Sequence, residues 1–316
     1  MVPQRDTSKP PRPIRRRRLA VRLLAGGVGV ATGLMLLGVA WPEGDSAVVH
    51  RDLTSAASLA DPPSRPITVL LIGSDADRRG AVRNGAAPAG PANSDALALV
   101  QVDPKGAVQV LSLPVEAAVQ LPGDKRPVSL GSLYRRGGPA LVAGASADLV
   151  GLPKGQPDRY LVLPRAALRQ LVDDLGRIEL APDRNMRYQD KAQNYKIQLD
   201  GGMQLLSGNQ VEQLLRFRDP DRGEDARRER QQMAIESVLR QMGQQQQLTQ
   251  LPDLLRQLQD QVDTNLTQSE ALSLLAAALQ QSESVRFRQL PLGPASQPGE
   301  RLRAVDPAAR DQAWTP

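Results

Sequence analysis

The sequence predicts a single α/β domain with a central mixed β-sheet flanked by helices, preceded by one N-terminal transmembrane helix. Two observations, short β-branched runs and the amphipathic stretches between them, predict the domain. Short β-branched runs such as Ile67–Ile72 alternate with longer amphipathic stretches such as Pro164–Leu175, and this alternation is typical of α/β folds. A third observation predicts the membrane helix, because residues 23–41 form an uncharged, mostly apolar run of 19 residues, about the length that crosses a bilayer.

The residues before the apolar run indicate its orientation. Residues 1–22 hold eight Lys and Arg against one Asp, so the positive-inside rule places this basic tail in the cytoplasm and the domain outside. The alternative is a cleaved signal peptide, with Gly38-Val39-Ala40 as a small-x-small site. Because the apolar run is long for a signal peptide, we expect an uncleaved signal anchor and a single-pass protein of the cell membrane.

Composition excludes several kinds of chemistry. The 40 Lys and Arg exceed the 34 Asp and Glu, but the excess lies in the basic tail, so no nucleic-acid partner is expected. The chain has no cysteine, and its one histidine, His50, precedes the predicted domain. A Ser-His-Asp triad, a histidine zinc site and a cysteine nucleophile are therefore excluded there. Catalysis would have to use carboxylates, arginines and a hard metal ion such as Mg²⁺.

The first half of the domain places two carboxylates at strand ends. Asp75 follows a buried strand, and Asp95 precedes a strand that a turn at residues 103–106 joins to a partner. Because α/β folds gather functional residues at strand ends, both are candidate site residues, although each is equally explained as a turn residue. The strands expected here cover residues 67–72, 96–102 and 107–113.

Helices and strands continue to alternate as far as residue 292. A linker over residues 42–66 precedes the domain, which spans residues 67–292, and a Pro- and Gly-rich tail over residues 293–316 is expected to be loosely ordered. Ser207 and Thr267 are the expected N-caps of two helices. The later helices are expected over residues 139–149, 164–175, 207–215, 254–262 and 269–279, with strands over residues 160–163, 178–180 and 196–199.

An arginine-rich stretch from Leu215 to Gln232 is the centre of the functional hypothesis. Arg216-Phe217-Arg218 is expected to be extended, so that its two arginines share one face. A turn at residues 219–221 then leads to a helix that begins after Gly223, with two acidic residues in its first turn. On that helix Arg227, Arg230 and Gln231 are spaced i, i+3, i+4 and share a face.

This spacing allows two interpretations. Four guanidinium groups would surround a multiply charged phosphate, because each offers a planar fork of donors that matches phosphate oxygens. The alternative is a solvated helix with ion pairs along its outer face and Met233, Val238 and Met242 on its buried side. The four guanidinium groups belong to Arg216, Arg218, Arg227 and Arg230.

Six short motifs occur in a characteristic order. They are Leu-Leu-Ile-Gly-Ser-Asp (70–75), Asn-Ser-Asp (93–95), Leu-Ser-Leu-Pro (111–114), Tyr-Arg-Arg-Gly-Gly (134–138), Arg-Phe-Arg (216–218) and Arg-x-x-Arg-Gln-Gln (227–232). Together they resemble the LytR-CpsA-Psr family of cell-envelope proteins from about Ile67 to Leu279. The resemblance implies an extracytoplasmic phosphotransferase that moves a glycopolymer from a polyprenyl-pyrophosphate carrier to peptidoglycan. The implied partners are that donor, peptidoglycan and membrane lipid.

The resemblance also implies roles for individual residues. Asp75, Asp95 and Glu224 would hold Mg²⁺, and catalysis would depend on Asp95, Arg218 and Arg227. The pyrophosphate would contact the four arginines named above and Gln231. These roles suit phosphoryl transfer, which depends mainly on positioning and charge stabilisation.

The chain departs from the family's pattern at several positions. The family's Arg-Ser-Asp-Thr appears as Asn93-Ser94-Asp95-Ala96, and its Ile-Pro-Arg-Asp as Leu113-Pro114-Val115-Glu116, so two arginines are missing; Ser129 and Gly131 replace the usual Lys and Asn. Val115 is expected to lie beside the strand ends that carry Asp75 and Asp95. The alternative function is therefore a catalytically weak polyprenyl-phosphate-binding or scaffold protein. A transcriptional regulator is a third possibility, for which only the 22-residue tail is available.

Overall fold

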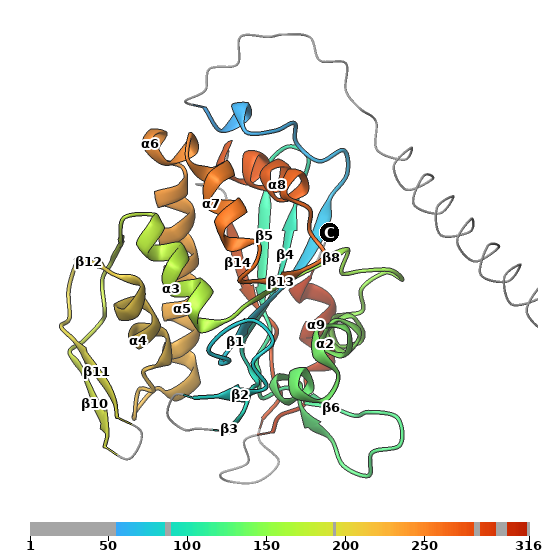
Figure 1. Cartoon of the computed structure of the whole chain (residues 1–316). Helices are drawn as coiled ribbons and strands as arrows, with labels where there is room; N and C mark the ends of the chain where they lie inside the picture. Colours follow the sequence, from blue (N-terminus) through green and yellow to red (C-terminus); the bar gives the residue numbers. More distant parts are fainter. Residues whose placement is uncertain (1–54, 86–89, 192–193, 281–284, 295–301, 315–316) are drawn as a thin grey trace, which may run out of the picture. The chain divides into compact units, whose positions relative to one another are not determined.

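The computed structural model describes residues 55–85, 90–191, 194–280, 285–294 and 302–314, all within one folded unit that begins at Arg51 (Figure 1). The expected basic tail (1–22) and signal anchor (23–41) lie outside these ranges, as does the first part of the expected linker. Within the described ranges, none of the helices combines the length and the apolar composition needed to cross a membrane.

A mixed β-sheet forms the centre of the unit, as predicted. In the described ranges it has six strands in the order β13-β8-β1-β4-β5-β14 (Figure 1). β1 lies in the middle, antiparallel to β4 and parallel to β8. The predicted hairpin is also confirmed, since β4 and β5 pair antiparallel. The strands are β1 (Ile67–Ser74), β4 (Ser94–Val102), β5 (Val108–Ser112), β8 (Arg159–Leu163), β13 (Asp263–Thr264) and β14 (Arg286–Gln289).

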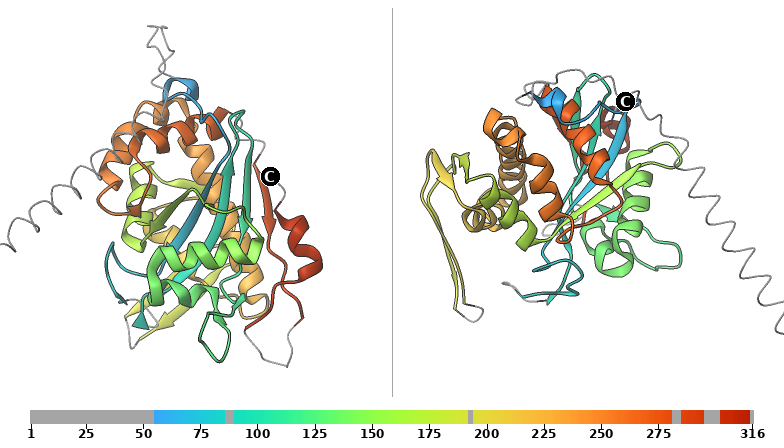
Figure 2. Two further views of the ribbon diagram at one scale, coloured as in Figure 1. Left: turned by 90° about the vertical axis from the view of Figure 1, so that its right-hand side faces the viewer. Right: turned by 45° about the horizontal axis from the view of Figure 1, so that its top comes forward.

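Helices cover both faces of the sheet (Figure 2). One face buries Leu70, Ile72 and Leu99 against α2 (Tyr134–Val150) and α9 (Pro307–Ala313). The opposite face buries another set of side chains against α8 (Gln268–Gln280). The two sets alternate along the strands because successive residues of a strand point to opposite faces. The second set includes Ala98, Val102, Val108 and Val110.

A second apolar cluster lies among the helices that precede and follow the arginine-rich stretch. It includes Val172 of α3, Val211 and Leu214 of α4, and Phe217 between α4 and α5. The helices here are α3 (Arg165–Asp174), α4 (Gly208–Arg216), α5 (Gly223–Met242), α6 (Gln245–Leu248) and α7 (Leu251–Leu258). Short strand pairs adjoin them: β9 (Ile178–Leu180) with β12 (Gln204–Leu206), and β10 (Met186–Asp190) with β11 (Tyr195–Leu199).

The remaining described elements are short. They are β2 (Arg83–Asn84), β3 (Gly90–Pro91), β6 (Ala118–Val119), β7 (Val128–Ser129) and the 3-10 helices η1 (Ala56–Ser58) and η2 (Leu130–Leu133).

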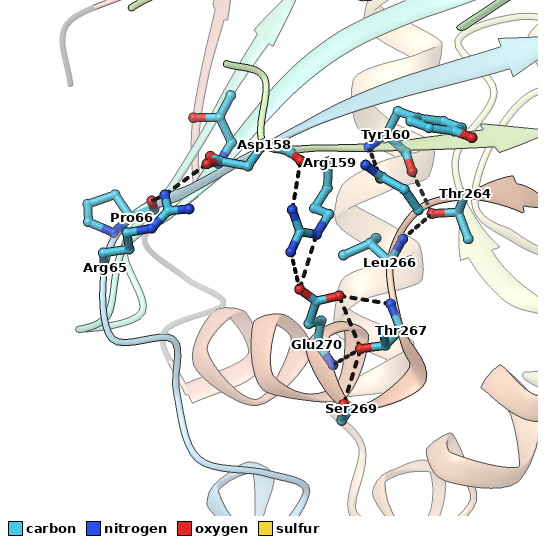
Figure 3. Close-up of polar contacts among 12 residues, drawn as sticks. Arg65, Pro66, Asp158, Arg159, Tyr160, Thr264, Leu266, Thr267, Ser269 and Glu270 are labelled. Carbon is cyan, nitrogen blue, oxygen red and sulfur yellow. Dashed lines mark hydrogen bonds and ion pairs between the residues drawn. The ribbon is translucent and has the colours of Figure 1, made fainter. Parts of the chain in front are cut away.

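Both predicted helix caps are present. Ser207 and Gln210 form a capping box at the start of α4. Before α8, the Thr267 backbone N–H donates to Glu270 Oε2 over 2.9 Å, and the Glu270 N–H donates to Thr267 Oγ1 over 3.2 Å. Figure 3 shows this cap beside the ion pair of Arg159 and Glu270. This network ties the start of β8 to α8, at the end of the sheet opposite Asp75.

The expectation of a loosely ordered tail over residues 293–316 is wrong for its described part. Val305 bridges to Leu292, and Asp306 caps α9 by accepting from the Ala308 N–H at 2.9 Å. Trp314 is 9% exposed and belongs to the core cluster of the α2 face. The Pro- and Gly-rich composition gave no sign of this buried tryptophan. Its burial makes the described residues 302–314 part of the domain.

Candidate active site

The end of β1 and the start of β4 bring Asp75 and Asp95 to one edge of the sheet. Ser74 is the register partner of Ser94, so Asp75 directly follows the last residue of β1 and Asp95 is the second residue of β4. Asp75 Oδ1 accepts from the Asn93 N–H at 2.7 Å, and its Oδ2 accepts from Asn84 Nδ2 at 3.2 Å. The strand-end placement is therefore confirmed, and Asp75 also bonds the chain reversal as a turn residue does.

Asp75 sits in an unfavourable electrostatic position. Its side chain is largely buried, and burial is the main cause that raises the pKa of this carboxyl above 3.8. The negative charge of Asp95 raises the pKa further, while the Asn93 N–H opposes the shift. A buried carboxylate beside a second carboxylate is a suitable ligand for a cation, which would relieve both effects.

Arg227 connects α5 to this edge. Its side chain is 5% exposed, and its Nη2 donates to the backbone carbonyl of Asp95 and lies 3.6 Å from Asp95 Oδ1. Its Nη1 donates to Glu224 Oε2 at 3.2 Å. Arg218 lies further out, 69% exposed, with its Nε 4.0 Å from Glu224 Oε1. The structure thus brings together four of the predicted site residues, with Glu224 between the two arginines.

The prediction that Arg216 and Arg218 share a face of extended chain is wrong. α4 continues through Arg216, because the Phe217 N–H donates to the Gln213 carbonyl at 3.0 Å, and the chain becomes extended at Phe217. Arg216 is therefore largely buried, with its guanidinium 4.6 Å from the centre of the Tyr195 ring. Its positive charge acts on Asp75, whose pKa it lowers.

Arg230 occupies a supporting position. It is 2% exposed, and its Nη2 donates to the Phe217 carbonyl at 2.6 Å, while its Nη1 is 4.0 Å from Asp183 Oδ1. Burial lowers the pKa of this guanidinium. Arg230 therefore holds the chain reversal between α4 and α5, and Gln231 beside it is half-buried.

The amphipathic interpretation of α5 is confirmed, whereas the phosphate-site interpretation stays a prediction, and Arg216 and Arg230 are held by other partners. Met242 is buried and Met233 and Val238 pack against apolar clusters, as a solvated amphipathic helix requires. On the outer face, Arg222 and Glu229 form an exposed ion pair. Arg227, in contrast, is buried and directed at the strand edge, as the phosphate-site interpretation requires.

Sequence reasoning missed a carboxylate that organises three arginines. Glu212 on α4 is 3% exposed, and its Oε1 lies 2.6 Å from Arg165 Nε and 3.4 Å from Arg216 Nη1. Its Oε2 binds Arg169. We call these four residues the Glu212 cluster. The i, i+4 spacing of Glu212 and Arg216 was the signal in the sequence that could have revealed part of it.

A second missed pair links α5 to the segment after β5. Arg228 Nη1 donates to Glu116 Oε1 at 3.0 Å. Glu116 directly follows Val115. A Cβ added to Gly131 would lie 3.0 Å from the Cβ of Val115 and 2.8 Å from the carbonyl oxygen of Ser94. Val115 therefore lies beside the start of β4, as expected, and Gly131 is needed for this close approach.

The carboxylates fit Mg²⁺ in part. Among the described residues, no three Asp, Glu, His or Cys gather as a metal-binding group, so the expected set of Asp75, Asp95 and Glu224 is not assembled. Arg227 and Arg218 neutralise Glu224 instead. Proteins usually bind Mg²⁺ through one or two carboxylates plus waters and substrate phosphates, and Asp75 with Asp95 matches that donor set.

The fold and site define an α/β protein in which strand-end carboxylates meet buried arginines, an arrangement suited to a polyanionic ligand. A sequence model of the LytR_cpsA_psr family matches residues 46–313, and the chain belongs to that family. The resemblance of the motifs is thereby confirmed.

Individual relatives are distant but cover most of the chain. The polyisoprenyl-teichoic acid–peptidoglycan teichoic acid transferase TagU of Enterococcus faecalis is 27% identical over 223 residues, 69% of this chain and 67% of that protein. The crystal structure of B. subtilis TagV matches with a TM-score of 0.63 at 19% identity, covering 79% of this chain and 94% of that chain. The LytR-Csp2A-Psr enzyme from Actinomyces oris matches with a TM-score of 0.58 at 21% identity, covering 80% and 95%.

Proposed function

We propose that this protein is a membrane-anchored, extracytoplasmic phosphotransferase that moves a glycopolymer from a polyprenyl-pyrophosphate carrier to peptidoglycan. Family membership and the name of the Enterococcus relative, a polyisoprenyl-teichoic acid–peptidoglycan teichoic acid transferase, support the reaction class. The observation that carries the proposal is the buried Arg227, which contacts Asp95 at the strand edge where Asp75 also lies. The apolar run over residues 23–41 and the arginines before it support the anchor and its orientation.

The reaction assigns a task to each group. A hydroxyl of peptidoglycan attacks the phosphorus that carries the glycopolymer, the bond from this phosphorus to the bridging oxygen breaks, and polyprenyl phosphate leaves. Asp95, 41% exposed, would accept the hydroxyl proton. Arg227 and the exposed Arg218 would stabilise the charge that develops on the phosphate oxygens. Arg216, through its effect on Asp75, completes the positive side of the site.

A magnesium ion would be held by Asp75 and Asp95. When bound, it would neutralise charge on the pyrophosphate oxygens. The raised pKa of Asp75, caused first by burial and also by the negative charge of Asp95, is consistent with this assignment, because a bound cation would favour the charged carboxylate. Arg230 would act behind the site by holding the backbone between α4 and α5, and Gln231 would contact the pyrophosphate.

The test is transfer by the full-length protein in detergent, from a polyprenyl-pyrophosphate-linked glycopolymer to peptidoglycan fragments with Mg²⁺. Asp95→Ala and Arg218→Ala should each lower turnover by roughly 10²–10³, the usual cost of removing one charge-stabilising group. Arg256→Ala is the control, because this exposed arginine lies on a separate helix, α7, and pairs there with Asp253. Wild-type turnover by both site variants would refute the proposal.

One observation favours a second candidate function, a lipid-phosphate-binding scaffold. Val115, in the segment after β5 and beside the start of β4, brings an apolar side chain where the family's pattern has arginine. If the wild-type protein binds the donor but shows no Mg²⁺-dependent turnover, the scaffold role is correct and the transferase role is wrong.

A further inference from the structure

Arg228 is an arginine of α5 that takes no part in the proposed mechanism. Its side chain is 14% exposed and reaches two carboxylates, Glu116 through Nη1 and Asp225 through Nη2. Arg227 and Arg228 are consecutive, so their side chains leave the helix about 100° apart. They therefore reach neighbouring segments of the same edge, the start of β4 at Asp95 and the segment after β5 at Glu116.

The two ion pairs of Arg228 differ in character. Glu116 is 18% exposed and fixes one side of the guanidinium, whereas Asp225 is 74% exposed. An exposed ion pair contributes about 0–1 kcal/mol, so water or another anion replaces Asp225 at little cost. The geometry thus fixes the position of the guanidinium through Glu116 and leaves its Nη2 side exchangeable.

Buried polar atoms at this pair lack partners. Within the described ranges, Arg228 Nε and Glu116 Oε2 are both buried with no hydrogen bond, and Arg227 Nε is in the same state. Buried polar atoms in folded proteins nearly always have partners, so such exceptions indicate unmet binding capacity. The Nη2 of Arg228, which is held by the exposed Asp225, is the donor that an anion can reach, and the unpartnered Nε lies buried beside it. A phosphate oxygen accepts a charge-assisted hydrogen bond from such a donor.

We propose that Arg228 is a further binding residue for the donor pyrophosphate. Glu116 positions its guanidinium, and the phosphate replaces Asp225 on Nη2. This inference rests on the proposed function and extends it. It also accounts for Val115, because Arg228 supplies a positive charge to the segment in which residue 115 supplies none.

The test measures binding of geranylgeranyl pyrophosphate to the full-length protein by titration calorimetry. Arg228→Ala should weaken binding about 10- to 150-fold, the value of a charged hydrogen-bond pair. Asp225→Asn should strengthen binding up to about fivefold, because it removes the competing carboxylate. Arg256→Ala is the matched control, since Arg256 forms the same i, i+3 ion pair with Asp253. Geranylgeraniol, which lacks phosphate, should bind all variants equally.

The outcomes separate this inference from the proposed function. If the wild-type protein binds the pyrophosphate and Arg228→Ala binds it equally well, the inference is wrong and the proposed function stands. If the wild-type protein shows neither binding nor transfer, both are wrong. Should Arg228→Ala lower the melting temperature or geranylgeraniol binding, Arg228→Gln decides, because it keeps a hydrogen-bond donor for Glu116 and removes only the charge. Unchanged pyrophosphate affinity in Arg228→Gln would then overturn the inference.

Discussion

The Glu212 cluster and the strand edge at Asp95 both combine arginines with carboxylates, but they differ in how completely the charges are satisfied. In the Glu212 cluster, three guanidinium groups bind one carboxylate that is 3% exposed. At the strand edge, Arg227 and Arg228 bind carboxylates that are partly exposed, and both arginines retain a buried Nε without a partner. The first arrangement is closed, while the second has donors left for a ligand.

Because of this difference, we expect the two regions to have different roles. Removing one member of a buried ion pair costs about 3–5 kcal/mol because its partner remains charged and buried, whereas exposed pairs contribute about 0–1 kcal/mol. The Glu212 cluster should therefore control stability, and the strand edge should control binding and turnover. Four predictions test this comparison.

The largest expected effect is on folding. Glu212→Ala should lower the free energy of unfolding by about 3–5 kcal/mol, because three guanidinium groups lose their shared carboxylate. Urea unfolding followed by circular dichroism measures this change. Glu229→Ala, at a 59% exposed side chain that pairs with Arg222, is the control and should change stability by no more than about 1 kcal/mol. Equal midpoints for the two variants would show that the cluster is not a stability element.

The second prediction concerns turnover at the strand edge. Arg227→Ala should lower the transfer rate by roughly 10²–10³, because it removes the guanidinium that contacts Asp95. Its effect on the free energy of unfolding should be smaller than that of Glu212→Ala. Transfer assays and urea unfolding on the same samples measure both quantities. The comparison fails if Arg227→Ala is the less stable variant and keeps wild-type turnover.

The third prediction restores a lost charge. Val115→Arg should recover about tenfold in pyrophosphate affinity when it is added to Arg228→Ala, because it returns one charged donor to the same segment. Val82→Arg in the same background is the control, since Val82 is 81% exposed. No recovery with Val115→Arg, or equal recovery with both variants, would mean that residue 115 does not face the pyrophosphate.

The smallest effect is a pair of opposite pH dependences. Because the pKa of Asp75 is raised, the folded state binds more protons than the unfolded state just above pH 3.8, and stability falls as pH rises there. Asp75→Asn should therefore stabilise the protein at neutral pH, and this gain should disappear below pH 3.8. Under the proposed Mg²⁺ assignment, added Mg²⁺ should stabilise the wild-type protein and should not stabilise this variant.

Asp219 should behave in the opposite way. The backbone N–H groups of Arg222 and Asp221 lower the pKa of its carboxyl to about 2. Its contribution to stability is present above pH 3.8 and is lost as pH falls towards 2, so Asp219→Asn should destabilise the protein at neutral pH. Thermal melts from pH 2 to 7 measure both variants. Shifts of the same sign for Asp75→Asn and Asp219→Asn would contradict the assigned electrostatics.

The sequence by itself determined the features that depend on local patterns. Apolar alternation placed the central strands and their hairpin, and the caps at Ser207 and Thr267 lie where their spacing indicated. Asp75 and Asp95 were found because strand ends follow from the strands themselves. Such features need only residues a few positions apart, whose propensities and hydrogen bonds are readable in order along the chain.

Only the tertiary structure decided which charges meet. Arg165 and Glu212 are 47 positions apart, and Arg228 and Glu116 are 112 positions apart, so no local pattern relates them. α4 extends through Arg216, where the Phe217 N–H donates to the Gln213 carbonyl. Arg216 therefore lies in the Glu212 cluster and does not share a face with Arg218. Trp314 is likewise a core residue because it is buried in the cluster that includes side chains of α2. Whether a guanidinium is buried, paired or available depends on how distant segments pack, because its partners and its access to water are set in three dimensions.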